Sequence, residues 1–211
     1  MSCSFQPAVL WCATRLMPIT AEQKGSRPGR RATIRFLKGD SILNELSMVA
    51  KLMALSARTA PKGAGMDFIV TEIVEGDGLA VLGQKMIEFG ERTGKKLFDR
   101  DGDNVMNSGA VLLVGMKDAK DVGLNCGACG AEKCIKINTF DGEYKGPQCS
   151  LRMLDMGIAL GSAVKTASLL NADSRIMYRI GPVAREMGLI DADVVIGIPL
   201  SATGKSIYFD R

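Results

Sequence analysis

The sequence of 211 residues contains no histidine, and this absence narrows the chemistry that the protein can carry out. Serine and cysteine nucleophiles are ordinarily activated by a neighbouring imidazole, so Ser/His and Cys/His dyads are excluded. Any transition metal must likewise be held without imidazole ligands. Ordinary hydrolase chemistry is therefore not expected.

Long apolar runs are also lacking. No stretch approaches the ~20 consecutive apolar residues that a membrane-spanning helix needs. The chain is nevertheless 46% hydrophobic, which is enough for a buried core. We expect a compact protein without a membrane segment, located in the cytoplasm because nothing in the chain suggests an oxidising compartment.

Acidic residues are scarce in the first 39 residues, which carry seven Lys or Arg and one Glu, a net charge of +6. Since the whole chain carries +4, residues 40–211 carry −2. The basic character belongs to this leader, which argues against nucleic-acid binding because a binding domain clusters its cations on a folded face. We expect residues 1–39 to be a disordered basic leader, either a transit peptide or an upstream extension without a structural role.

Residues 40–211 alternate between helical and strand patterns. Apolar residues recur at helical spacing from Ile42 to Met53 and from Leu79 to Phe89, and a long apolar helix is predicted after residue 150. Its glycines at 157 and 161 would let another helix or a ligand approach closely, and close helix packing is the favoured interpretation. Strands are predicted over 67–74, 109–116 and 193–200. These elements predict one α+β domain with a mixed sheet over residues 40–211.

Two further stretches carry conflicting signals. Residues 174–188 have a helical pattern but contain Pro182, which predicts a kink or two short helices. The run "DRDGDN", residues 99–104, alternates carboxylates like a calcium loop but lacks the required glycine and glutamate, so it predicts a polar loop.

Four of the six cysteines lie within 24 residues: Cys126, Cys129, Cys134 and Cys149 are spaced C-x2-C-x4-C-x14-C. Three cysteines this close in sequence are awkward for independent disulfides, so metal binding is the economical interpretation. Without histidine, the soft ligands available are thiolates, which select Zn²⁺ or an iron–sulfur cluster.

The spacing favours the cluster and leaves zinc open. Structural zinc usually takes two short cysteine pairs, whereas a triplet with a distant fourth cysteine is typical of clustered ferredoxin ligands. Gly127 and Gly130 each follow a cysteine, where a chain that turns tightly around sulfur requires positive φ. We predict one [4Fe-4S] cluster in an inserted segment, residues 124–150, with structural zinc as the alternative.

The run "CGACGAEKC" with its distant fourth cysteine resembles the four-iron modules of an electron-transport component of Rnf-type complexes and of corrinoid iron–sulfur proteins. The resemblance implies that the four cysteines named above are the cluster ligands. From about residue 42 onward, the chain resembles an uncharacterised prokaryotic family described as containing a ferredoxin domain. The stretches that carry this second resemblance include "LSARTAPKGAGMD", "DNVMNSGAVLLVGM", "MGIALGSAV" and "DVVIGIPLSATGKSIYFDR". That family implies a cluster and assigns no reaction.

The chain also remotely resembles flavin-dependent nitroreductases. Those chains begin with a helix, an "A-P-S-x-x-N-x-Q-P" turn and a strand, and "TAPKGAGMDFIV" follows the same order. Lys62 replaces the serine of that turn, and its asparagine and glutamine are absent. The resemblance implies a nitroreductase-like fold, bound FMN and a homodimer. Arg58, Lys62 and Lys205 are candidate contacts for a flavin phosphate or another anion, although the C-terminus of a helix is the commoner role for residues placed like Arg58 and Lys62.

Three functional hypotheses follow. The first is an iron–sulfur protein that acts in electron transfer or redox sensing with a redox partner protein. The second is a nitroreductase-like oxidoreductase in which the cluster feeds a flavin. The third is an interaction protein with structural zinc, and all three place the metal on the same four cysteines.

Overall fold

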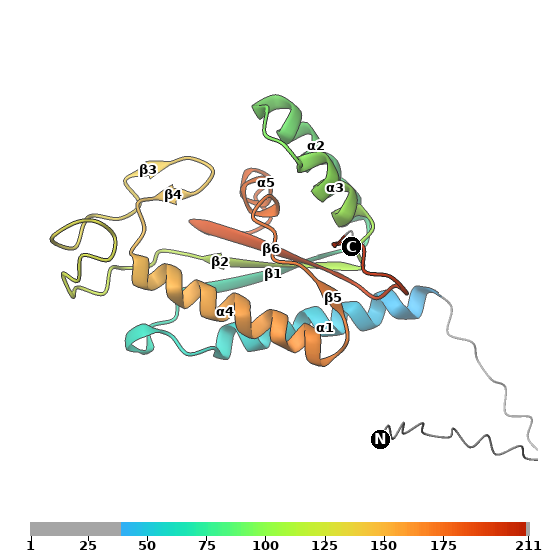
Figure 1. Cartoon of the computed structure of the whole chain (residues 1–211), viewed down its shortest axis with the longest axis horizontal. Coiled ribbons are helices and arrows are strands. Elements are labelled where there is room, and N and C mark those ends of the chain that lie inside the picture. Colours follow the sequence, from blue (N-terminus) through green and yellow to red (C-terminus); the bar gives the residue numbers. More distant parts are fainter. Residues whose placement is uncertain (1–38, 210–211) are drawn as a thin grey trace, which may run out of the picture. The chain divides into compact units, whose positions relative to one another are not determined.

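The computed structural model describes residues 39–209, so the predicted leader lies outside the described residues except for Gly39. A four-stranded sheet with the order β1-β2-β6-β5 has helices on both faces (Figure 1). The helices are α1 (Gly39–Thr59), α2 (Asp77–Thr93), α3 (Phe98–Met106), α4 (Ser150–Leu169) and α5 (Ile180–Glu186), with a short 3-10 helix η1 (Gly63–Gly65). The strands of the sheet are β1 (Ile69–Glu75), β2 (Ala110–Met116), β5 (Asp173–Ser174) and β6 (Val194–Ser201), while β3 (Phe140–Asp141) and β4 (Lys145–Gly146) form a separate hairpin.

The α+β fold predicted from the sequence is confirmed, but the sheet is antiparallel at each of its pairings rather than mixed. Ile69 of β1 lies opposite Met116 of β2, which in turn lies opposite Val194 of β6. All seven residues of β2 are buried. A central strand with helices on both faces buries both sets of its side chains, which explains its continuous apolar sequence.

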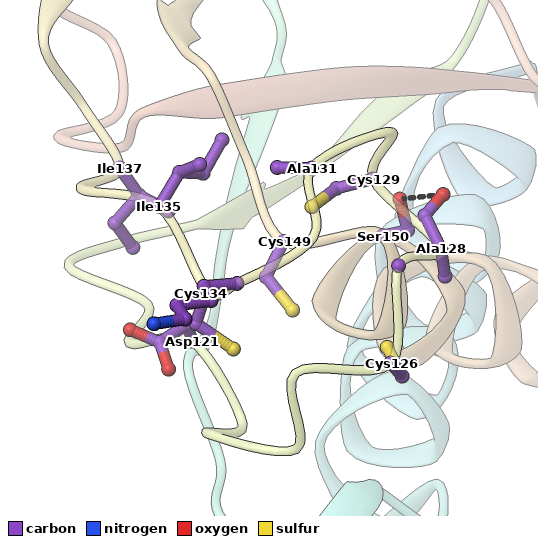
Figure 2. Close-up of a pocket in the computed structure, with 12 residues that line it drawn as sticks. Asp121, Cys126, Ala128, Cys129, Ala131, Cys134, Ile135, Ile137, Cys149 and Ser150 are labelled. Carbon is purple, nitrogen blue, oxygen red and sulfur yellow. Dashed lines mark hydrogen bonds between the residues drawn. The ribbon is translucent and has the colours of Figure 1, made fainter.

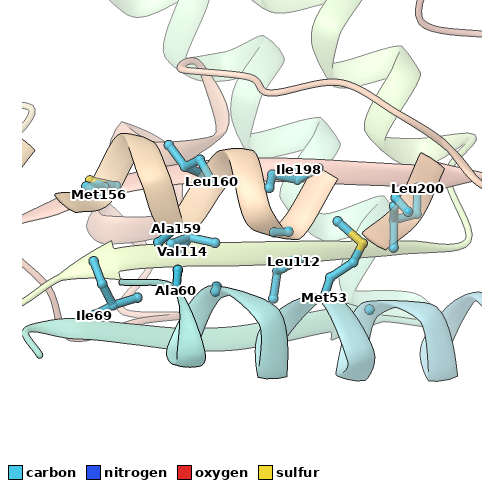
Figure 3. Close-up of a cluster of buried hydrophobic side chains, with 14 of the residues drawn as sticks. Met53, Ala60, Ile69, Leu112, Val114, Met156, Ala159, Leu160, Ile198 and Leu200 are labelled. Carbon is cyan, nitrogen blue, oxygen red and sulfur yellow. The ribbon is translucent and has the colours of Figure 1, made fainter. Parts of the chain in front are cut away.

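Two hydrophobic clusters, one on each face of the sheet, form the core. Helices α1 and α4 cover one face, where Met53 and Ala159 pack with Leu112 of β2 (Figure 3). Helices α2, α3 and α5 cover the other face. There Met86 and Phe98 pack in a second cluster with the strand side chains that point to that face. None of the described helices is long and apolar enough to cross a membrane.

Helix α3 corrects the prediction of a polar loop at "DRDGDN". Its carboxylate Asp101 is buried and accepts hydrogen bonds from Arg179 at 2.8 Å and from Arg100 at 2.7 Å. Helices α2 and α3 approach so closely that a Cβ added at Gly83 would lie 2.6 Å from the carbonyl oxygen of Gly102. This helix therefore depends on contacts with distant residues that its own polar pattern does not reveal.

Pro182 lies in the first turn of α5, so residues 174–188 contain one short helix without a kink. A proline is tolerated there because the first turn of a helix has no intrahelical partner for its N–H groups.

The predicted role of the α4 glycines is also corrected. Gly157 and Gly161 are exposed, and a Cβ added at either would meet nothing within 4 Å.

Candidate metal centre

The cysteine segment connects β2 to α4 at one end of the sheet. Cys129 lies in a turn, Cys126 and Cys134 lie in irregular backbone on either side of it, and Cys149 is the N-cap residue of α4. Side chains of all four line one pocket (Figure 2). The structure thus brings together the four residues that the sequence predicts as metal ligands.

The turns that place the first three cysteines depend on left-handed backbone conformations. Gly127 and Gly130 have φ angles of 72° and 89°, as predicted, and the N–H of Gly130 donates to the carbonyl of Gly127 at 2.9 Å. Asn125 also has positive φ and ties the segment together. Its N–H donates to the Cys134 sulfur at 3.4 Å, and its side-chain oxygen accepts from the Cys134 N–H at 2.9 Å.

Cys149 caps the N-terminus of α4, and its backbone surroundings favour the thiolate. Burial raises the pKa of its thiol, but hydrogen bonds from the backbone N–H groups of Val122, Arg152 and Leu151 oppose that effect. Together with the nearby charge of Arg152, they hold the pKa of Cys149 below its usual value. Donors at a helix N-terminus favour the thiolate, which is the form that binds metal.

The donor set fits a thiolate-ligated metal group. All four cysteines are free thiols, three of them exposed and Cys149 half-buried. Other walls of the pocket are mostly apolar, as at Ala131, Ile135 and Ile137, so the sulfurs are its principal soft donors. Across residues 39–209, no group of three or more Cys, Asp or Glu side chains is arranged so that it could hold a metal ion. The four thiols share a pocket without converging on one point.

Asp193, directly before β6, anchors residues on both sides of the first three cysteines and was missed in the sequence analysis. Its buried carboxylate accepts from the N–H of Asp118 at 2.7 Å and from the side chain of Asn138 at 3.0 Å. It also pairs with Lys145 at 3.1 Å. The sequence signal that could have found it is a carboxylate directly before an apolar strand. A charged group buried at such a place needs hydrogen-bond or ion-pair partners.

Replacing Asp193 with alanine is expected to lower the free energy of unfolding by about 2 to 3 kcal/mol, since it removes several hydrogen bonds to a buried charged group. Urea unfolding followed by circular dichroism measures this loss. Asp191→Ala is the matched control, because Asp191 is exposed and pairs with Lys117 at the surface. That control should change stability by no more than about 1 kcal/mol. Equal effects of the two substitutions would contradict the anchoring role of Asp193.

The sequence also did not single out a buried ion pair beside the pocket. Arg152 and Asp155 lie three residues apart on the buried face of α4, joined at 3.0 Å. Two charged residues on the apolar face of a helix are the signal that would have found them. Arg152 donates to the carbonyl of Lys120, four residues before the cysteine segment begins.

The three candidate anion-binding cations lie apart. The Lys62 side chain is buried, although the residue as a whole is partly exposed, and its ammonium donates to the carbonyls of Ala57, Arg58 and Ala60 at 2.7 to 3.1 Å, so it caps the C-terminus of α1. Arg58 pairs with Asp67 at 3.1 Å. Both precede the start of β1, whereas Lys205 follows the end of β6, and the register places these at opposite ends of the sheet. The structure does not bring Lys205 together with Arg58 and Lys62.

The fold and the shared pocket define an α+β protein with a four-thiol site, and comparisons with known proteins give its family. A family described as "uncharacterized protein containing a ferredoxin domain" matches residues 145–211. A relative from Archaeoglobus fulgidus, itself described as an uncharacterized protein, is 52% identical over 169 residues, which is 79% of this chain and 91% of the relative. The chain belongs to this family of ferredoxin-domain proteins.

Solved structures of nitroreductase-family proteins resemble the chain at low identity. One from Clostridium novyi NT has a TM-score of 0.49 and 15% identity, covering 82% of this chain and 80% of that chain. A nitroreductase-like family protein from Bacillus cereus has a TM-score of 0.48 and 13% identity, covering 85% and 82%.

Proposed function

We propose that this chain is an iron–sulfur protein that binds one [4Fe-4S] cluster on Cys126, Cys129, Cys134 and Cys149, and that it acts in electron transfer or redox sensing. The observation that carries the proposal is that four cysteines spread over 24 residues line one pocket. Their family, described by its ferredoxin domain, supports the same cofactor. When bound, such a cluster supplies one-electron chemistry.

The chain's own residues would tune that chemistry. The N–H of Asn125 donates to the Cys134 sulfur, and Cys149 caps the N-terminus of α4, where the backbone N–H groups have no intrahelical partner. Hydrogen bonds to ligand sulfurs raise a cluster's reduction potential, and solvent exposure also affects it. Because three of the cysteines are exposed, a redox partner protein can approach the site from solvent. We propose a cytoplasmic location, a separate redox partner and a homodimer on the sequence arguments given above.

The test is one anaerobic preparation of the full chain, assayed for iron, acid-labile sulfide, zinc and flavin. We expect about four irons and about four sulfides per chain. About one zinc without sulfide would contradict the cluster and favour a structural zinc site. Bound FMN alongside the iron would favour the alternative in which the cluster feeds a flavin in a nitroreductase-like oxidoreductase.

A further inference from the structure

Arg152 is the largest fully buried side chain in the described part of the protein, and its hydrogen bonds reach two separate segments. Its Nε donates to the carbonyl of Lys120 at 2.9 Å, and Nη1 donates to the carbonyl of Gly63 at 2.8 Å. The guanidinium also lies over the ring of Phe68, 5.0 Å from its centroid. A buried guanidinium with this many directional contacts has a fixed position.

Asp155 provides the opposite charge of the same arrangement. One carboxylate oxygen pairs with Arg152 Nη1 at 3.0 Å, and the other accepts from the N–H of Gly63 at 2.7 Å. The pair therefore clamps the η1 turn against α4. Its two charges compensate each other in a region with little access to water, where electrostatic effects extend further than at the surface.

The pair lies next to the fourth cysteine. Arg152 lies in the first turn of α4, three residues after Cys149, which is the N-cap residue of the same helix. The Arg152 side chain also holds the carbonyl of Lys120, the residue before Asp121, which lines the pocket. Arg152 is thus joined to the pocket both by the helix that Cys149 caps and by the segment that contributes Asp121.

We propose that Arg152 and Asp155 are positioning residues that hold the backbone around Cys149 and shift the reduction potential of the site in opposite directions. This inference rests on the proposed function. A positive charge beside the ligands stabilises the reduced, more negative form, and a negative charge destabilises it. Removing Arg152 should therefore lower the potential, and removing the charge of Asp155 should raise it.

The test is a redox titration of the loaded full-length protein, followed by electron paramagnetic resonance, with iron and sulfide measured on each sample. Arg152→Met should reduce the equilibrium constant for one-electron reduction about tenfold, a shift of about 59 mV, and Asp155→Asn should increase it by a similar factor. The double variant should return close to the wild-type value. Arg152→Lys keeps the charge and should retain the wild-type potential while losing cluster faster, because its contacts with Lys120 and Gly63 are weakened. Lys165→Met, which removes an exposed charge from the same helix, should change neither property.

Shifts of the same sign in Arg152→Met and Asp155→Asn would show a purely structural role and overturn the inference while leaving the proposed function intact. If Arg152→Met does not fold, Asp155→Asn and Arg152→Lys decide the question. A raised reduction potential in Asp155→Asn together with an unchanged potential in Arg152→Lys supports the inference. Any other combination overturns it. A wild-type protein without iron and sulfide would overturn the proposed function, and this inference with it.

Discussion

Replacing Cys134 with alanine is expected to remove three or more of about four irons per chain. The physical reason is the loss of one thiolate from a set in which each sulfur would hold a different corner of the cluster. The substitution tests the role of the sulfur alone. The backbone hydrogen bond from residue 134 to Asn125 can still form when that residue is alanine. Iron and sulfide analysis after anaerobic purification measures the loss.

The chain supplies its own controls for this experiment. Cys3 and Cys12 belong to the predicted leader and lie outside the described residues, so Cys3→Ala and Cys12→Ala should keep the full iron content. Since Cys134 is exposed, its substitution should change the unfolding midpoint of the metal-free protein little. Unchanged iron in Cys134→Ala would remove this residue from the proposed ligand set.

Gly181→Ala is expected to destabilise the fold by about 3 kcal/mol or more, because the added methyl group has no space. An added Cβ would lie 1.8 Å from the carbonyl oxygen of Val195 in β6 and 2.6 Å from the hydroxyl of Tyr144. Backbone must move to relieve the first contact. Urea unfolding monitored by circular dichroism gives the change in the free energy of unfolding.

The same substitution should reach the metal site through Tyr144. That hydroxyl donates to the Val195 carbonyl at 2.7 Å and so attaches the β3–β4 hairpin, which lies between Cys134 and Cys149, to β6. We therefore expect Gly181→Ala to lose iron faster than the wild type. The matched control is Gly161→Ala, at an exposed helical position with no atom within 4 Å of the added group. That variant should gain about 0.5 to 1 kcal/mol, since alanine favours a helix over glycine. A Gly181→Ala protein as stable as the wild type would contradict the close contact between α5 and β6.

Much of the secondary structure could be predicted because its signals are local. Helix α2 ends at Thr93, and its C-cap residue Gly94 has a φ of 69°, as expected of a glycine that stops a helix. The buried strands β2 and β6 follow directly from their apolar runs. The positive φ angles of Gly127 and Gly130 were predictable because a chain that turns tightly around a cysteine sulfur needs a left-handed backbone conformation, which glycine adopts readily.

Other features could not be predicted because their causes lie far away in sequence. Helix α3 forms where Asp101 meets Arg179 and where Gly102 meets Gly83, and neither contact is visible in a window around "DRDGDN". Asp193 anchors residues 55 and 75 positions earlier in the chain. Arg152 holds residues 32 and 89 positions earlier. Each of these partners depends on how the strands and helices pack.

The sequence by itself determined the four cysteines, their spacing and the α+β class, because thiolate chemistry and hydrophobic periodicity depend on residue type and near neighbours. Only the tertiary structure decided that the sheet is antiparallel, that all four cysteines line one pocket, and that Lys205 lies at the opposite end of the sheet from Arg58 and Lys62. The physical reason is that strand pairing and buried ion pairs join segments whose separation along the chain carries no local signal.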